Sequence, residues 1–193
     1  MEIIFIPNGL AETLLINGLE GTDSKELEDV KNEIHQIDSS VKFKEVNLGT
    51  NADWIAVLAI INGITSVLLV GDKIVKGIDG WINLAKRIKG IFSRSEKVYI
   101  DKDTATILAI EHLSRVYKIE SIEKLNENII ALKDLSQMLS DRTEKDFIAK
   151  PFNVYFMTFK INDDIIISLG IRSDGEIKEL YSFDDISLPI EPF

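Results

Sequence analysis

Residues 54–71 read WIAVLAIINGITSVLLVG, eighteen consecutive residues without a charged side chain in a chain that is 28% charged. A helix needs roughly 20 apolar residues to cross a hydrocarbon core, so this stretch is slightly short, and it contains Asn62, Thr65 and Ser66. Segments with strand composition lie on both sides of it, and they need a hydrophobic layer to cover them. We therefore expect residues 54–71 to form the buried central helix of a folded domain, with membrane insertion as the alternative.

Apolar positions continue beyond this stretch, mostly at steps of three or four, as far as Ile88. A single helix over residues 54–92 would be roughly 58 Å long at about 1.5 Å per residue, longer than the domain around it. A break is therefore expected, and Asn62-Gly63, Gly71-Asp72 and residues 77–80 are the candidate positions. A helical hairpin or a sharply kinked pair is the predicted arrangement.

The segments before this region predict a β-α-β-like unit over residues 1–48. Residues 2–6 and 41–46 have strand composition, and residues 13–17 are a further candidate strand. Residues 24–38 follow capping side chains and place apolar residues at helical spacing, which predicts an amphipathic helix between the strands.

The second half of the chain predicts a strand at residues 97–100, a helix capped by Asp103, and another helix over residues 121–139. Three β-rich runs follow, joined by Asn162-Asp163 and by Ser173-Asp174-Gly175, which are turn sequences typical of hairpins. These runs cover residues 152–161, 164–172 and 176–183. They predict a three-stranded antiparallel meander, followed by a loop-like tail.

The predicted fold class is therefore α+β, with a β-α-β-like unit, a central broken hydrophobic and amphipathic helical region, and a C-terminal meander. The 193 residues are enough for one domain, and the 45% of them that are hydrophobic are enough for a packed core. We expect a single domain over residues 1–193, with two lobes that share a core, residues 1–118 and 119–193, as the alternative.

Composition excludes several function classes. The 22 Lys and Arg residues against 32 Asp and Glu residues give a formal charge of -10, so no nucleic-acid partner is expected. The absence of cysteine excludes disulfides, thiolate metal sites and a cysteine nucleophile. The opening MEIIFIPNG lacks the features of a secretory signal, so we expect a cytoplasmic protein, with a location peripheral to a membrane as the alternative.

Residues 98–104, VYIDKDT, form a hydrophobic strand followed by a D-x-D sequence. This motif resembles the nucleophile loop of haloacid-dehalogenase-type phosphatases, which implies a nucleophilic carboxylate at Asp101, an acid-base carboxylate at Asp103 and a Mg²⁺. The family places Thr or Val where this chain has Ala105, and its loop normally opens the domain. The competing interpretation is that Asp103 caps a helix.

No other motif predicts catalysis or a cofactor. His35 and His112 have no second histidine at metal-binding spacing, no serine lies in a G-x-S-x-G sequence, and no glycine-rich loop has phosphate-binding spacing. We therefore expect a protein that is not an enzyme and that binds no metal or other cofactor.

The only basic segment of the chain, residues 72–97, follows the uncharged stretch directly. Within residues 72–89 one helical face carries Ile74, Ile78, Trp81, Ile82, Ala85 and Ile88, and most lysines lie opposite. A basic amphipathic helix with a tryptophan is typical of a membrane-surface or partner-binding helix. The alternative is that its apolar face packs on a sheet and its lysines are solvated. The candidate interaction or membrane surface consists of Trp81, Lys73, Lys76, Lys86, Arg87 and Lys89.

The order of these segments resembles small effector-associated modules of bacterial conflict systems. The resemblance covers roughly residues 13–115, with a turn at Gly49, an apolar helix broken at Gly63, the stretch GWINLAKR at residues 80–87, and the strand at residues 98–100. It implies a non-catalytic adaptor that connects a sensor to an effector through protein contacts. The additional C-terminal segments would equally suit an immunity protein that masks a toxin.

The predicted function is therefore protein-protein interaction in a bacterial defence, toxin-immunity or signalling system, and the acidic composition favours a basic partner. A peripheral membrane protein anchored through residues 54–92 is the second hypothesis. A metal-dependent phosphohydrolase centred on Asp101 and Asp103 is the third.

Overall fold

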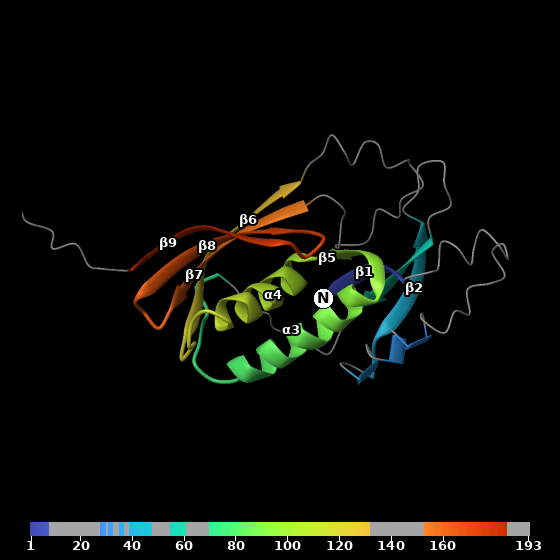
Figure 1. The fold of residues 1–193 in the computed structure, drawn as a ribbon, viewed down its shortest axis with the longest axis horizontal. Helices are drawn as coiled ribbons and strands as arrows, with labels where there is room; N and C mark the ends of the chain where they lie inside the picture. The colour runs from blue at the N-terminus through green and yellow to red at the C-terminus, as the bar shows by residue number, and fades with distance from the viewer. Residues whose placement is uncertain are drawn as a thin grey trace, which may run out of the picture.

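The part of the chain that the computed structural model describes contains two antiparallel sheets and the helices α3 and α4 (Figure 1), which confirms the α+β class. The described residues are 1–7, 28–29, 31–32, 35–36, 39–47, 55–60, 70–131 and 153–184. In chain order the elements are β1 (Glu2–Pro7), β2 (Lys42–Asn47), β3 (Ile55–Ile60), β4 (Lys73–Ile74), α3 (Ile78–Ser93), β5 (Ser95–Ile100), α4 (Lys102–Ser114), β6 (Ile122–Ala131), β7 (Asn153–Ile161), β8 (Ile165–Arg172) and β9 (Ile177–Asp184).

The four-stranded sheet has the order β2-β3-β1-β5, and every neighbouring pair is antiparallel. Strands β1 and β2 both pair with β3, so they run parallel to each other on either side of it. The helical residues 28–29, 31–32 and 35–36 lie between β1 and β2 in the sequence, in agreement with the predicted unit. The candidate strand at residues 13–17 lies outside the described residues.

The prediction of a central helix at residues 54–71 is wrong where the structure describes that stretch. Residues Ile55–Ile60 form β3, which pairs with β1 on one edge and with β2 on the other. An uninterrupted apolar run is compatible with a buried strand as well as with a buried helix, so its periodicity cannot separate the two. Residues 61–69 lie outside the described residues.

The amphipathic helix is confirmed, but it starts later than predicted. Helix α3 begins after Gly77, whose φ of 85° suits glycine, and Ile78, Ala85, Ile88 and Ile91 are buried along it. Lys73 and Ile74, predicted to belong to the helix, form β4 instead. Helix α4 is buried along almost its whole length because it lies between α3 and both sheets.

The five-stranded sheet has the order β4-β6-β7-β8-β9 and contains the predicted meander β7-β8-β9. The helix predicted over residues 121–139 is wrong at its start, because Ile122–Ala131 form β6; residues 132–139 lie outside the described residues. The wrong prediction is explained by a register shift in β6 between Lys124 and Asn126. The extra residue changes which face of the sheet the following residues occupy. Apolar residues along β6 then lie three or four positions apart, which is the spacing of a helix.

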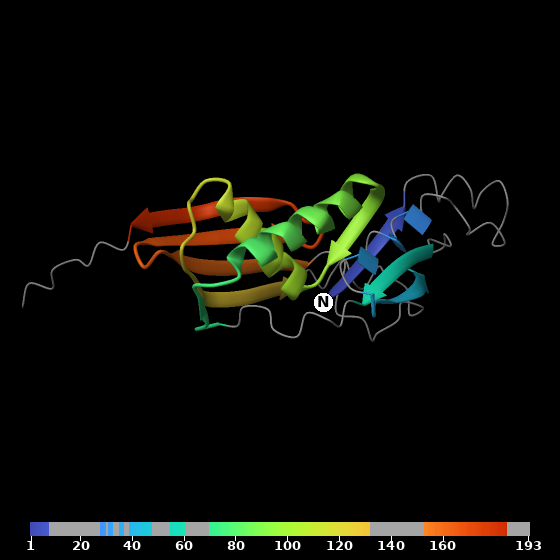
Figure 2. The same ribbon diagram turned by 90° about the horizontal axis from the view of Figure 1, so that it is seen from below.

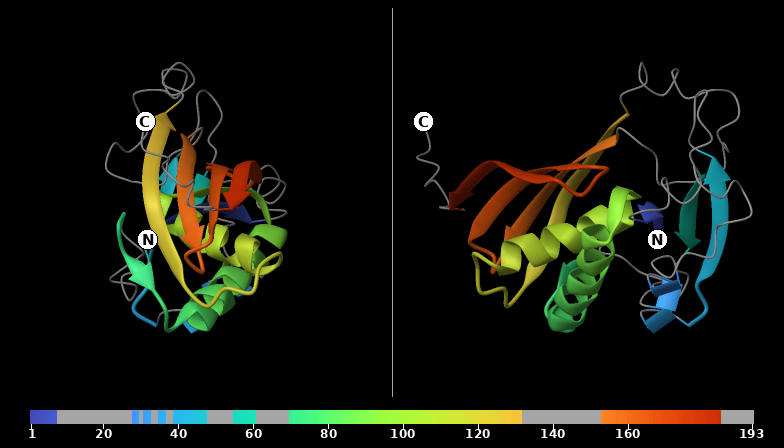
Figure 3. Two further views of the ribbon diagram at one scale, coloured as in Figure 1. Left: turned by 90° about the vertical axis from the view of Figure 1, so that its left-hand side faces the viewer. Right: turned by 45° about the vertical axis from the view of Figure 1, so that its right-hand side comes forward.

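Both helices lie on one face of the five-stranded sheet (Figures 2 and 3). One hydrophobic core joins the two sheets, with Ile3 and Phe5 of β1 and Tyr155 and Phe159 of β7 among its fully buried members. The Tyr155 hydroxyl donates to the Ile100 carbonyl at 2.6 Å, which ties β7 to the end of β5. Strand β4 pairs with β6, so segments of both predicted lobes share one sheet.

Candidate functional site

Three of the predicted basic surface residues make intramolecular contacts. Lys73 pairs with Asp163 in the β7–β8 turn at 2.5 Å, and Lys89 pairs with the buried carboxylate of Glu111 on α4. The Arg87 guanidinium donates to the Gln36 carbonyl at 3.0 Å. These contacts give the three side chains structural roles that the sequence did not predict.

The apolar face of α3 is directed into the protein. Trp81 and Ile82 pack against the core, while Lys76 and Lys86 are exposed. The helix therefore covers its own domain. Its hydrophobic face, which membrane binding would require, is occupied by packing against the core. Among the described residues, no helix is long and apolar enough to span a membrane.

Asp101, the first residue of the D-x-D motif, caps α4. Its Oδ1 accepts from the backbone N–H of Thr104 at 2.8 Å, and its Oδ2 accepts from the backbone N–H of Glu2 at 2.8 Å. The carboxylate is 2% exposed, and this burial raises the pKa of Asp101 although the hydrogen bonds from Thr104 and Glu2 oppose the shift. The predicted cap at Asp103 is therefore wrong by two residues, and Asp103 lies in the first turn.

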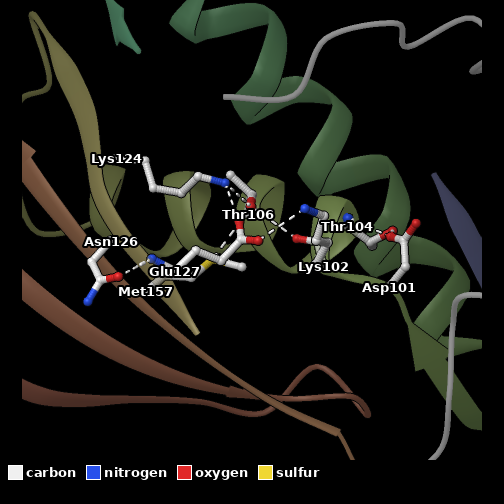
Figure 4. Close-up of polar contacts among 8 residues, drawn as sticks. All are labelled: Asp101, Lys102, Thr104, Thr106, Lys124, Asn126, Glu127 and Met157. Atoms are coloured by element: carbon white, nitrogen blue, oxygen red, sulfur yellow. Dashed lines mark hydrogen bonds and ion pairs between the residues drawn. The ribbon is translucent and has the colours of Figure 1, made fainter. Parts of the chain in front are cut away.

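A partly buried ionic network joins α4 to β6 (Figure 4). The Lys124 Nζ lies 2.6 Å from Glu127 Oε2, and the Lys102 Nζ lies 3.1 Å from Glu127 Oε1. Lys124 also donates to the Thr106 hydroxyl at 3.4 Å. Burial disfavours the ionised form of Glu127, but the hydrogen bonds from Lys124 and Lys102 outweigh it, so the pKa of Glu127 is lowered.

A second ionic group connects α3 with α4. Glu111 is almost fully buried and accepts from Lys89 and from Arg115, and these bonds lower its pKa against the effect of burial. Burial lowers the pKa of the neighbouring His112, and the positive charges of Lys89 and Arg115 add to this effect. No group of acidic and histidine side chains suitable for a metal ion occurs within the described parts of the chain.

The face of the five-stranded sheet opposite the helices, called the open face below, carries large apolar side chains. Residues 167, 169 and 171 of β8 are buried toward the helices, so residues 166, 168 and 170 point to the open face. The register places Phe183 opposite Ile166 and Tyr181 opposite Ser168, and therefore both aromatic residues lie on the open face.

Leu180, Tyr181 and Phe183 are 48%, 60% and 42% exposed, respectively. The rings of Tyr181 and Phe183 are 5.1 Å apart between centroids, and the Leu180 side chain lies over Gly170. All three belong to β9, which pairs only with β8 among the described strands and thus forms an edge of the sheet. No described helix lies on this face (Figure 3).

The charged residues at open-face register positions are mainly basic, although the whole chain is acidic. Lys160 lies opposite Ile166, Arg172 opposite Val154, and Lys178 opposite Gly170, whereas Glu123 is the acidic residue, opposite Lys160. Arg172 is already paired with Asp174 and Glu176 in the β8–β9 turn. The open face thus combines an apolar centre with charged residues at its rim.

Sequence reasoning missed both the ionic network and the open face. The sequence places Lys124 in a predicted helix, so it gives no sign of the buried contact between Lys124 and Thr106. The open face had a detectable signal, because Leu180 and Tyr181 are adjacent in a predicted strand and Phe183 follows two positions later, so large side chains occupy both alternating sets of positions.

Comparison with known proteins returned no match: no family model fits the chain, and neither the curated proteins nor the solved structures contain a significantly similar one.

Proposed function

We propose that this protein is a non-enzymatic protein-binding module, and that its partner docks on the open face of the five-stranded sheet. The observation that supports this proposal is the cluster of Leu180, Tyr181 and Phe183, whose exposed fractions lie between 42% and 60%. Contiguous apolar side chains at a surface, especially with a polar rim, are typical of protein interaction sites. Tyrosine is also among the residue types enriched at binding hot spots.

The charge on the open face favours a partner whose contact surface is apolar with acidic residues around it. Arg172 is already paired, but at the remaining open-face register positions Lys160 and Lys178 outnumber Glu123, so acidic residues on the partner would be attracted there. The charge of the whole chain predicted a basic partner, but the charges nearest the contact have the larger influence on binding, because salt screens distant ones. A second copy of the chain would bring basic residues against basic residues.

The family resemblance supplies the biological setting of the proposal, a bacterial defence, toxin-immunity or signalling system. In that setting the partner is a toxin, sensor or effector, and the gene for it is expected to lie beside the gene for this protein. The module acts by occupying a surface of that partner, and its own side chains take part in no covalent step.

The experiment that tests this function begins with a photoreactive amino acid placed at position 181 in living cells, with position 86 on α3 as the matched control. The protein that is cross-linked from position 181 is then purified, and its affinity for the wild-type chain is measured. Tyr181→Glu should weaken binding about 30-fold or more, which corresponds to about 2 kcal/mol for a hot-spot residue. Lys86→Glu should leave it unchanged. Equal affinity of the wild type and Tyr181→Glu would contradict the proposal.

A further inference from the structure

Strand β9 forms a border of the five-stranded sheet, and its outer edge pairs with no other described strand. Figure 2 shows this strand in red at one side of the sheet, and the register pairs it with β8 alone. In an antiparallel pair, residues that bond to the neighbouring strand alternate with residues whose N–H and C=O groups point away from it. The outward groups of β9 are therefore directed to the side on which a further extended chain would lie.

The edge of β9 is exposed on both faces of the sheet. Residues 178–183 are all exposed, an uninterrupted run. Tyr181 and Phe183 lie on the open face, whereas Ser182 lies on the helix side because its register partner Ile167 is buried there. Exposure on both faces means that neither α3 nor α4 covers this part of β9. A strand that approaches the edge therefore meets no obstacle from these helices.

The exposed edge carries little protection against pairing with another chain. Natural proteins protect edge strands with charged residues, proline or a bulge, because a free apolar edge accepts further strands. The register leaves Leu180 without a partner on β8, which is a bulge, but regular pairing resumes at Tyr181. Residues 180–183, LYSF, contain no charged residue and no proline. An uncharged edge of this kind matches recognition by strand addition.

From these observations we infer that the protein partner adds an extended segment to β9, as a further strand of the five-stranded sheet. This inference rests on the proposed function, because it specifies how the partner reaches the open face. Main-chain hydrogen bonds along β9 contribute the affinity, and the side chains of the added strand determine the specificity. Those side chains extend the apolar cluster of the open face past its present border.

The exposed side chains of β9 define the chemistry of the added segment. Residues beside Tyr181 and Phe183 are apolar, and a residue beside Lys178, which is exposed and also at an open-face position, is acidic. Residues on the helix side are polar, because Ser182 is polar and exposed there. The segment thus alternates between apolar and polar residues. A second copy of the chain fits less well, because each copy has a net charge of -10 and the two would repel each other.

Amide hydrogen exchange of the full-length chain tests the inference, with the protein captured from position 181 as the partner. In the free chain, alternate amides of β9 should exchange rapidly, because only the others donate to β8. In the purified complex these rapid amides should slow by about 100-fold or more, since each then belongs to a strand ladder. Unchanged exchange along β9 in the complex would overturn the inference.

A proline substitution gives a second measurement. The Ser182 side chain is on the helix side, so Ser182→Pro leaves the apolar cluster in place, but proline donates no hydrogen bond and excludes a neighbouring strand. Ser182→Pro should weaken partner binding about tenfold or more, the equivalent of one or two lost hydrogen bonds. The matched control Ser182→Ala should bind like the wild type. Wild-type affinity of a Ser182→Pro chain that circular dichroism shows to be folded would contradict the inference, and the exchange measurement decides if this variant does not fold.

The free chain provides a further way to refute strand addition. Slow exchange of every β9 amide without the partner would show that the edge is already occupied. Sedimentation would then assign the occupant to another part of the same chain if the protein is a monomer, or to a second copy if it is a dimer. Either result would overturn the inference.

The measurements separate this inference from the proposed function. If Tyr181→Glu weakens binding but the β9 amides stay unprotected in the complex, strand addition fails and the proposed function stands. If the β9 amides become protected but Tyr181→Glu binds like the wild type, docking on the open face fails and strand addition is supported. If no protein is captured from position 181, both fail.

Discussion

Gly77 and Gly175 have almost the same left-handed backbone, with φ of 85° and 87°, but different surroundings. A Cβ atom at Gly77 would meet no heavy atom within 4 Å, whereas at Gly175 it would overlap the ring of Phe92 on α3. The glycine before α3 is therefore required by its backbone alone. The glycine in the β8–β9 turn is required by its backbone and by the packing of α3 against that turn.

This difference predicts unequal effects of alanine substitution. Gly77→Ala should lower the free energy of unfolding by about 1–2 kcal/mol, the cost of a left-handed conformation for a residue with a Cβ. Gly175→Ala should lower the free energy of unfolding by this amount and by about 1–3 kcal/mol more, because the new Cβ would overlap the ring of Phe92. Urea unfolding followed by circular dichroism measures both. Equal midpoints for the two variants would show that Phe92 moves aside without cost.

Substitution of Asp101 should destabilise the protein more than substitution of Asp103. Asp101→Ala removes the cap of α4, worth about 1 kcal/mol, and leaves the Glu2 N–H without its partner in the interior, which costs about 1–3 kcal/mol. Asp103→Ala removes only an acidic residue from the first helical turn, worth about 0.3–1 kcal/mol. Thermal unfolding of the two variants compares them, and a larger loss for Asp103→Ala would contradict the assignment of Asp101 as the cap.

At the level of elements, the network of Lys102, Lys124 and Glu127 fixes α4 on β6. Glu127→Ala should cost about 3–5 kcal/mol, because Lys124 keeps its charge in a nearly fully buried position. The double variant Lys124→Met, Glu127→Leu removes both charges and should recover most of this loss. Chemical unfolding of Lys124→Met, of Glu127→Leu and of the double variant gives the coupling energy. A double variant no more stable than Glu127→Ala would contradict the argument.

The same network makes stability depend on pH in a defined direction. The pKa of Glu127 is lowered in the folded protein, so its stabilising effect is fully present above the unfolded value of about 4.3. The effect is lost as the pH falls through the folded pKa. Unfolding free energies measured from pH 6 downward should therefore fall less steeply for the double variant than for the wild type. Parallel curves would mean that Glu127 titrates as an exposed residue.

Elements with one clear signal were predicted correctly from the sequence, and elements with mixed signals were not. The isoleucine-rich residues 2–6 before Pro7 identified β1, and the turns at residues 162–163 and 173–175 identified the C-terminal meander. Strand β3 is apolar throughout, and β6 contains a register shift, so both imitated helices. Side-chain position on a sheet follows from pairing between distant segments, which is why the open face and the ionic network were missed.

At the scale of the whole molecule, we expect no membrane binding by the basic residues 72–97, because the apolar face of α3 is packed inside. In a flotation assay with phosphatidylserine-rich vesicles, the wild type and a Trp81→Ala, Ile82→Ala variant should both stay at the bottom. The variant should also unfold at a lower urea concentration, because Trp81 contributes to the core. Flotation of the wild type and not of the variant would instead support membrane anchoring.

The four-stranded sheet cannot be completed until β5 has been synthesised. Strand β1 pairs with β5, and the Glu2 N–H reaches its acceptor on Asp101 across 99 positions of sequence. At about 5–20 residues per second, the ribosome needs roughly 5–20 s to make that stretch. During this interval the apolar residues of β1 emerge before the strand that completes their sheet, so they stay exposed for longer. We therefore expect the time needed to reach residue 100 to influence how much newly made protein reaches the native state.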